Sequence, residues 1–185
     1  MKRRHFVIGT LLVASAISLG SDLYARDPFT LETVRSQVVR DYGGVSHMST
    51  QAFAARMSRQ PDILLLDVRE EGEFAVSRLA GAERVDPDIW RWTFMNRFGD
   101  RVRGKTVIFY CAVGVRSSRL AERVQTALKE QGAKAVYNLD GGIFAWHNER
   151  RPLVNARGQT DFVHPFDTYW GQLVKRSDMA RTSPE

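Results

Sequence analysis

The sequence has 185 residues, of which 43% are hydrophobic and 26% are charged, as expected for one globular domain with extensions. The 14 Gly and 6 Pro residues are too few for a low-complexity or collagen-like chain. Cys111 is the single cysteine, which excludes an intramolecular disulfide and any metal or iron–sulfur site built from several thiolates of one chain. The formal net charge is +6, but basic and acidic residues are interspersed without a basic stripe or interleaved aromatic residues. The charge therefore does not indicate nucleic-acid binding.

Residues 1–25 have the pattern of a secretory signal peptide. The basic start KRRH precedes an apolar run over residues 6–20, and the small residue Ala25 allows cleavage behind it. The run is shorter than the roughly 20 residues of a spanning helix, and an uncleaved anchor and a buried core helix remain the alternatives. Two arginines, one residue and then Phe-Val resemble a twin-arginine export signal, with general secretion as the alternative. We expect an exported, periplasmic protein that contacts a membrane only through this segment, if it stays uncleaved.

Residues 26–43 are predicted to form a helical extension before the main domain. Within residues 28–42, apolar side chains recur at the spacing of one helix face, at Leu31, Val34, Val38 and Val39. The pair Gly43-Gly44 ends the predicted helix.

Residues 44–150 alternate between helical patterns and short apolar runs. The predicted elements are, in order, a helix over 51–59 capped by Ser49 or Thr50 and stopped by Pro61, a strand over 63–67, a short apolar stretch over 82–85, a helix over 86–98 with Pro87 in its first turn, a strand over 106–110, a helix over 116–131, a strand over 135–139 and a short helix over 143–147. Strands without polar alternation, separated by helices, indicate an α/β fold whose parallel sheet is covered on both faces. Ligands bind such sheets at the carboxyl ends of the strands.

Residues 99–106, GDRVRGKT, match the phosphate-loop pattern G-x-x-x-x-G-K-[ST]. A phosphate loop follows a strand and opens a helix, so that backbone amides face the phosphates. Here a predicted helix precedes the motif and a strand follows it. We therefore interpret Gly104-Lys105 as a turn into the strand and not as part of a nucleotide site.

Cys111 has the position that a nucleophile needs. In CAVGVRS, residues 111–117, it follows the strand over 106–110 and precedes a short glycine-containing loop and a helix. Loop N–H groups, the positive end of the helix and the guanidinium of Arg116 all favour the thiolate, which is the nucleophilic form. The alternative from position alone is a buried structural cysteine, since free cysteine packs like a small hydrophobic residue.

The motifs together resemble the rhodanese, or sulfurtransferase, domain family. They are DVREEGEF at 67–74, AGA at 80–82, CAVGVRS at 111–117 and LDGGIFAW at 139–146, in the family's order and spacing. The resemblance covers residues 44–150. It implies a rhodanese-like parallel sheet of about five strands flanked by helices on both faces, and a six-residue loop whose first member carries a persulfide.

The resemblance also implies roles for individual residues. Cys111 matches the persulfide-bearing catalytic cysteine, and the loop expected to cradle the sulfur consists of Ala112, Val113, Gly114, Val115 and Arg116. The residues expected to support this loop as scaffold are Asp67, Arg69 and Ser117. No cofactor and no metal is implied.

Two features depart from the family pattern, and one separates the chain from related phosphatases. Ser77-Arg78-Leu79 stands where Gly-His-Ile is common, in a stretch that is usually structural. Positions 112, 113 and 115 are apolar where members that use thiosulfate often have Arg or Lys, which predicts weak use of thiosulfate. Cysteine phosphatases place five residues between Cys and Arg, whereas four lie between Cys111 and Arg116 here. The shorter loop favours a terminal sulfur over a tetrahedral phosphate.

The remaining candidates have mainly structural interpretations. The histidines outside the signal segment are not paired at metal-ligand spacing and are expected on the surface or in packing, at His47, His147 and His164. Trp90 and Trp92 are expected in the core or at its rim. The C-terminal arm, residues 151–185, contains the aromatic-rich stretch 162–173, interpreted as an arm packing on the domain or, alternatively, as a protein-partner surface or a lid over the site.

These observations leave two hypotheses for the function. The first is a sulfurtransferase that takes sulfane sulfur from thiosulfate, a persulfide or a polysulfide onto Cys111 and passes it to a thiol or cyanide acceptor. The second is a rhodanese-like protein-binding module with little or no turnover.

Overall fold

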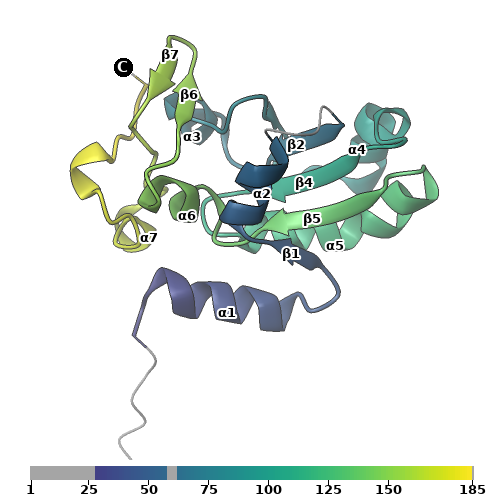
Figure 1. The fold of residues 1–185 in the computed structure, drawn as a ribbon, viewed down its shortest axis with the longest axis horizontal. Helices are drawn as coiled ribbons and strands as arrows, with labels where there is room; N and C mark the ends of the chain where they lie inside the picture. Colours follow the sequence, from purple (N-terminus) through teal and green to yellow (C-terminus); the bar gives the residue numbers. More distant parts are fainter. Residues whose placement is uncertain (1–27, 58–61, 185) are drawn as a thin grey trace, which may run out of the picture.

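The computed structural model describes residues 28–57 and 62–184. Its centre is a five-stranded sheet with helices on both faces, and a C-terminal arm covers one end of this layered unit (Figure 1). The predicted signal peptide lies outside the described residues. Within the described part of the chain, no helix is long and apolar enough to cross a membrane.

The sheet is entirely parallel, as predicted. Its strands, in the spatial order β1-β5-β4-β2-β3, are β1 Ser46–Met48, β5 Ala135–Leu139, β4 Thr106–Tyr110, β2 Ile63–Asp67 and β3 Glu83–Arg84. The central strand β4 is buried along its whole length, as its uninterrupted apolar sequence predicts. Its register pairs Asp67 with Tyr110, so β2 and β4 end side by side immediately before Cys111.

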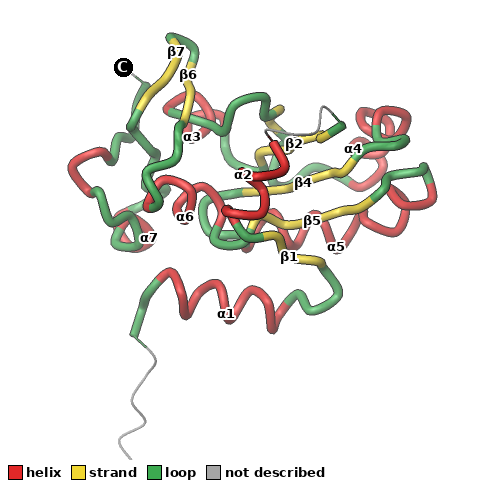
Figure 2. Tube along the Cα trace, in the orientation of Figure 1, coloured by secondary structure: helices red, strands yellow, loops and turns green. Residues whose placement is uncertain are grey.

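The helices form two layers around this sheet (Figure 2). Their bounds are α1 Leu31–Asp41, α2 Thr50–Met57, α3 Glu71–Val76, α4 Arg91–Phe98, α5 Val115–Glu130 and α6 Gly142–Asn148. α4 and α5 pack on the face that receives Val107 and Phe109 of β4. α2 and α6 pack on the face that receives Ile108 and Tyr110. The alternation along one buried strand therefore divides the core into two apolar clusters.

Several boundaries and side chains differ from the predictions. The helix expected over 86–98 begins only at Arg91, because Asp86 closes a turn: its side chain accepts the N–H of Asp88 and its carbonyl accepts the N–H of Ile89. Pro87 therefore lies in this turn and not in a helix. Val39 of α1 is 44% exposed, so the buried face of that helix is narrower than its apolar spacing suggests.

The two exposed tryptophans correct another prediction. Trp90 and Trp92 were expected in the core or at its rim but are 81% and 74% exposed. They flank the start of α4, and Phe94 and Phe98 of the same helix fill the core instead. The face of α4 that carries Phe94 and Phe98 packs on the core, and Trp92 lies on the opposite face, toward solvent.

The phosphate-loop match belongs to a structural turn. The short 3₁₀ helix η1, Gly99–Arg101, follows α4, and Gly104 adopts a positive φ of 72° before β4 begins. Only a residue that tolerates the left-handed region fits such a turn readily. The order of helix, turn and strand confirms the interpretation of Gly104-Lys105 as an entry to the strand.

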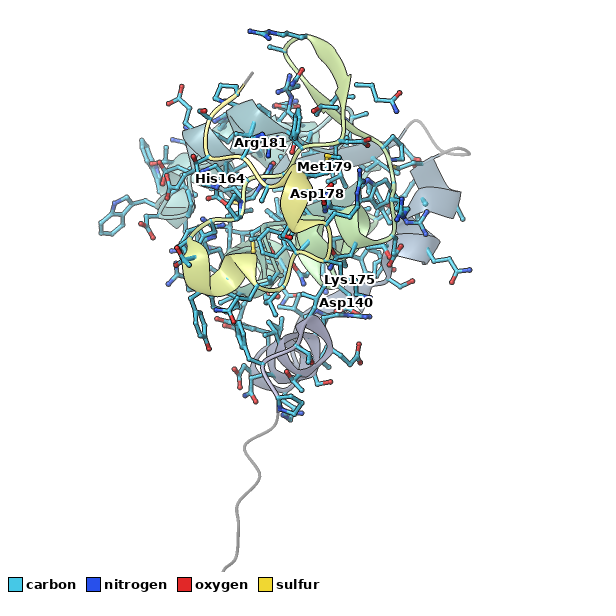
Figure 3. The ribbon with its side chains drawn as sticks, turned by 90° about the vertical axis from the view of Figure 1, so that its left-hand side faces the viewer. Asp140, His164, Lys175, Asp178, Met179 and Arg181 are labelled. Atoms are coloured by element: carbon cyan, nitrogen blue, oxygen red, sulfur yellow. The ribbon has the colours of Figure 1, made fainter. Side chains whose placement is uncertain are left out.

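The C-terminal arm packs on the α2 and α6 side of the domain. It contains a hairpin of β6 Leu153–Asn155 and β7 Gly158–Thr160, then the short helix α7 Thr168–Gly171 and the 3₁₀ helix η2 Ser177–Met179. Val163, Leu173 and Val174 are buried in the apolar cluster that contains α6. The N–H of Arg181 donates to the carbonyl of Val163, which ties the end of the arm to its middle. Figure 3 views the arm from this end, with His164, Met179 and Arg181 labelled.

Candidate active site

Cys111 lies at the carboxyl end of β4, where the chain leaves the sheet. Its side chain is buried, with 1% of the residue exposed, and its Sγ accepts the backbone N–H of Gly114 at 3.2 Å. Gly114 has a φ of 104°, a conformation that L side chains rarely adopt, and α5 begins at the next residue. The loop is thus folded back so that an amide at the start of α5 points at the sulfur.

The glycine pair Gly141-Gly142, at the start of α6, fixes the loop from the other side. The N–H of Ile143 donates to the carbonyl of Cys111 at 2.9 Å, and the N–H of Phe144 donates to that of Ala112 at 3.0 Å. Gly142 has a φ of 57°, and a Cβ there would lie 2.6 Å from the carbonyl oxygen of Ala112. The close approach of α6 to the cysteine loop therefore requires glycine at position 142.

Substituting Gly142 by alanine is expected to displace the cysteine loop and to lower the reactivity of Cys111 at least tenfold, with a loss of roughly 1–3 kcal/mol in stability from the strained backbone. The rate of Cys111 alkylation and urea unfolding measure the two effects. Gly158→Ala is the matched control, since Gly158 also has a positive φ but a Cβ there would meet nothing within 4 Å. Equal alkylation rates in the two variants would contradict the role given to the glycine pair.

Asp67 and Arg69 form a buried ion pair beneath the site. Arg69 donates from Nε and Nη2 to the two carboxylate oxygens of Asp67 at 2.8 and 2.6 Å, and its Nη2 also donates to the carbonyl of Ser77. Both side chains are 0% exposed. Burial alone would lower the pKa of Arg69, but the charge and hydrogen bonds of Asp67 outweigh it and raise the pKa further. Ser117, also fully buried, donates to Oδ1 of Asn138 at 2.6 Å and ties α5 to β5.

Arg116 faces the site but is paired with Glu73 of α3. Its Nη1 and Nη2 donate to the two carboxylate oxygens of Glu73 at 2.7 and 2.9 Å. Burial raises the pKa of Glu73, whereas the hydrogen bonds and charge of Arg116 lower it, and the net pKa lies below the ordinary value. The ion pair therefore persists at neutral pH, and it is lost only in acid, as the pH falls through the lowered pKa of Glu73. This pairing balances the one positive charge of the loop.

A small cavity of about 140 Å³ opens over the cysteine. Its lining consists of Cys111, Ala112, Val113, Val115, Arg116, Phe166 and Trp170. The structure thus brings Cys111 and all predicted loop residues except Gly114 together around one opening. Gly114 contributes its backbone N–H to the sulfur instead, and Asp67, Arg69 and Ser117 lie outside the opening. Apart from Cys111 and Arg116, the side chains that line it are apolar or aromatic.

Three residues of this site were not named from the sequence, although a lid over the site was one interpretation of the stretch that contains two of them. Glu73 stands in the DVREEGEF motif, where its acidic character alone gave no sign that it pairs with Arg116. Phe166 and Trp170 come from the aromatic-rich stretch 162–173, whose density of rings was the available signal.

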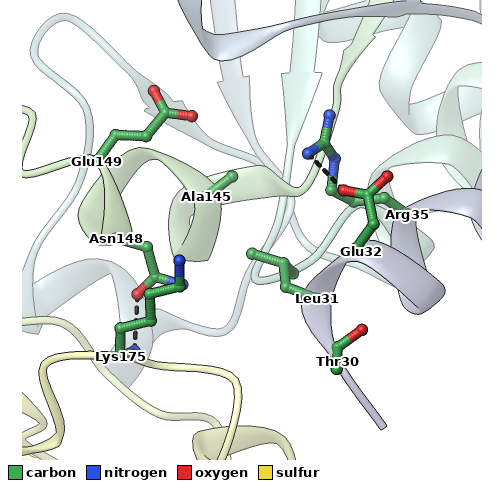
Figure 4. A pocket seen from close by; sticks show the side chains of 8 residues that line it. All are labelled: Thr30, Leu31, Glu32, Arg35, Ala145, Asn148, Glu149 and Lys175. Atoms are coloured by element: carbon green, nitrogen blue, oxygen red, sulfur yellow. Dashed lines mark hydrogen bonds and ion pairs between the residues drawn. The ribbon is translucent and has the colours of Figure 1, made fainter. Parts of the chain in front are cut away.

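A larger cavity of about 380 Å³ lies elsewhere, between α1, α6 and the arm (Figure 4). It contains none of the predicted site residues. Its most prominent cation, Arg35, is engaged by Glu32 at 3.1 Å and by Asp140 at 2.5 Å. A second cation, Lys175, also lines this cavity.

The histidines have structural surroundings. His147 is buried, and its Nε2 lies 3.0 Å from the carbonyl oxygen of Asp161. Burial lowers the pKa of His147 and of His164. Within residues 28–57 and 62–184, no cluster of His, Cys, Asp or Glu side chains could hold a metal ion.

Comparison with known proteins identifies the family. Residues 49–149, more than half of the chain, match the rhodanese-like domain family, so the chain belongs to it. A sulfurtransferase of Allochromatium vinosum is 27% identical over 62% of this chain and 99% of its own length. A tRNA uridine(34) hydroxylase of Bacillus pumilus is 32% identical over 66% of this chain, but this chain spans only 36% of that relative.

A solved structure agrees with the fold. The thiosulfate sulfurtransferase of Pseudomonas aeruginosa superposes with a TM-score of 0.52 at 17% identity, covering 78% of this chain and 26% of that chain. The five-stranded parallel sheet and its two helical layers are therefore the fold of this family.

Proposed function

We propose that the protein is a sulfurtransferase that carries sulfane sulfur on Cys111 between a donor and a thiophilic acceptor. The observation that supports this most strongly is the placement of the single cysteine at the end of β4, with the N–H of Gly114 on its sulfur and the N-terminus of α5 behind it. Amides and a helix N-terminus stabilise negative charge, which suits both a thiolate and a terminal persulfide sulfur.

The proposed reaction has two displacement steps. In the first, the thiolate of Cys111 attacks the outer sulfur of the donor, a new sulfur–sulfur bond forms, and the donor's own bond to that sulfur breaks. The donor remnant leaves with the bonding electron pair. In the second, cyanide or a thiolate attacks the terminal sulfur, and the thiolate of Cys111 is restored. Neither step needs a cofactor to balance electrons.

Mass spectrometry of the intact protein tests the first step. After incubation with a persulfide or polysulfide donor, we expect a mass increase of one sulfur atom, mapped to the peptide that contains Cys111. Prior alkylation of Cys111 should prevent the increase. An unmodified protein after exposure to thiosulfate, persulfide and polysulfide would favour the protein-binding module instead.

Removing the negative charge of Glu73 should increase the use of thiosulfate. In Glu73→Gln the guanidinium of Arg116 keeps a hydrogen-bond acceptor but loses its balancing charge, so an anionic donor meets a net positive site. We expect kcat/KM for thiosulfate to rise by about tenfold at low ionic strength. This corresponds to about 1.4 kcal/mol of additional attraction between the anionic donor and the site. The gain should shrink as salt is raised.

Glu71→Gln is the matched control for this measurement. Glu71 lies in the same helix and loses the same charge, but its side chain is exposed. Equal gains in both variants would show that overall charge, and not the Arg116 pair, sets the use of thiosulfate.

A further inference from the structure

Two aromatic side chains of the C-terminal arm complete the wall of the cysteine cavity. Phe166 and Trp170 line it together with Cys111, although they lie outside residues 49–149, the part that matches the family. Trp170 lies in α7, whose N-cap Asp167 accepts the backbone N–H of Trp170 on Oδ1 at 2.8 Å. Its ring makes an edge contact with Phe29, with 5.7 Å between the ring centroids. The arm therefore adds a feature to the site that the family domain alone does not supply.

Phe166 is presented to the site by a strained turn. Its φ is 69°, and the N–H of Asp167 donates to the carbonyl of Pro165 at 3.0 Å, which together define a γ-turn with positive φ. Such turns are rare for a bulky residue and persist only where the surroundings hold them. Here the guanidinium of Arg116 lies 4.7 Å from the centroid of the Phe166 ring. The turn thus directs an aromatic ring onto the loop cation.

The charge balance of the cavity determines what it can accept. Arg116 is paired with Glu73, and the ring of Phe166 lies against its guanidinium. Little of its positive charge is therefore available to a ligand. The other side chains around the opening are apolar. Transfer of a dianion such as thiosulfate into this setting loses hydration without gaining a free cation, whereas an apolar group gains from leaving water.

We infer that Phe166 and Trp170 make the site selective for an organic sulfane donor, in which the part of the donor that leaves carries an apolar group R. The inference rests on the proposed function. A thiosulfonate, R–SO₂–S⁻, represents this class: the thiolate of Cys111 attacks the terminal sulfur, the sulfur–sulfur bond of the donor breaks, and the sulfinate R–SO₂⁻ leaves with the electron pair. Thiosulfate reacts by the same displacement with sulfite as the leaving group, so the two donors differ mainly in charge and in the group R.

The test compares benzenethiosulfonate with thiosulfate, with cyanide as acceptor, in the wild type, Phe166→Ala, Trp170→Ala and Trp92→Ala. Within one variant, the ratio of the two kcat/KM values removes any effect of the substitution that is common to both donors. Comparing this ratio between variants also removes the difference in intrinsic reactivity between the two donors. We expect the ratio, benzenethiosulfonate over thiosulfate, to fall by about tenfold in Phe166→Ala and Trp170→Ala. It should stay unchanged in Trp92→Ala, because Trp92 is an aromatic residue of α4 that is 74% exposed and does not line the cavity.

Unfolding curves establish that each variant is folded, and Phe166→Leu and Trp170→Leu replace any alanine variant that is not. An unchanged ratio in the folded variants at both positions would overturn the selectivity, while sulfur transfer itself would stand. Failure of both donors to load Cys111 in the wild type would instead overturn the proposed function.

Discussion

Replacing Cys111 with serine is expected to abolish sulfur transfer and to leave the free energy of unfolding nearly unchanged. The hydroxyl is close in size to the thiol and can accept the same N–H from Gly114, so the loop keeps its contact. A serine hydroxyl is a far weaker nucleophile than a thiolate, and among the described residues that line the cavity there is no histidine or carboxylate to act as its base. Initial rates of thiocyanate formation from cyanide and a sulfane donor, followed in both proteins, measure the loss.

Urea unfolding of the same two proteins is the control for this substitution. If the two unfolding curves coincide while sulfur transfer is lost, the loss of activity comes from the chemistry of the sulfur atom and not from a change in stability. Residual transfer in Cys111→Ser at more than a small fraction of the wild-type rate would contradict the proposal, because the chain has one cysteine.

Replacing Asp67 with asparagine should produce the largest loss of stability among single charge substitutions. It removes the negative charge that balances Arg69 where both side chains are 0% exposed. Breaking such a buried pair from one side typically costs about 3–5 kcal/mol, because a buried charge is left unpaired. The free energy of unfolding in urea measures the effect.

The half-exposed ion pair between Glu83 and Arg101 provides the matched comparison. Its side chains are 37% and 42% exposed, so Glu83→Gln should cost at most about 1 kcal/mol. The double variant Asp67→Leu with Arg69→Met should recover much of the loss, since no charge remains buried. Equal costs for Asp67→Asn and Glu83→Gln would show that the buried pair does not support the loop.

The sheet was predictable because its central strands are continuous apolar runs. Residues 106–110 and 63–67 became β4 and β2 as expected, and the alternation with helices indicated their parallel arrangement. The same local order placed Cys111 at a strand end. In contrast, β1 has three residues and only Met48 buried, too weak a pattern to predict a strand.

The contacts that shape the site were not predictable from local patterns. Glu73 and Arg116 lie 43 residues apart, and neither residue's neighbours indicate the pairing. Phe166 and Trp170 reach the cavity because the arm folds back over α6, which is a property of tertiary packing. Pro87 is compatible with both a turn and the first turn of a helix. The structure has the turn, because hydrogen bonds to Asp86 stabilise it.

Single-turnover transfer of isotopically labelled sulfur tests the central claim most directly. Protein loaded with a heavy sulfur isotope from the donor, freed of excess donor and mixed with cyanide, should lose the label from Cys111 and release it as labelled thiocyanate in equal amount. The two changes should share one rate constant. Label that stays on Cys111 after cyanide is added, or labelled thiocyanate that forms equally well when Cys111 has been alkylated beforehand, would contradict transfer through this cysteine.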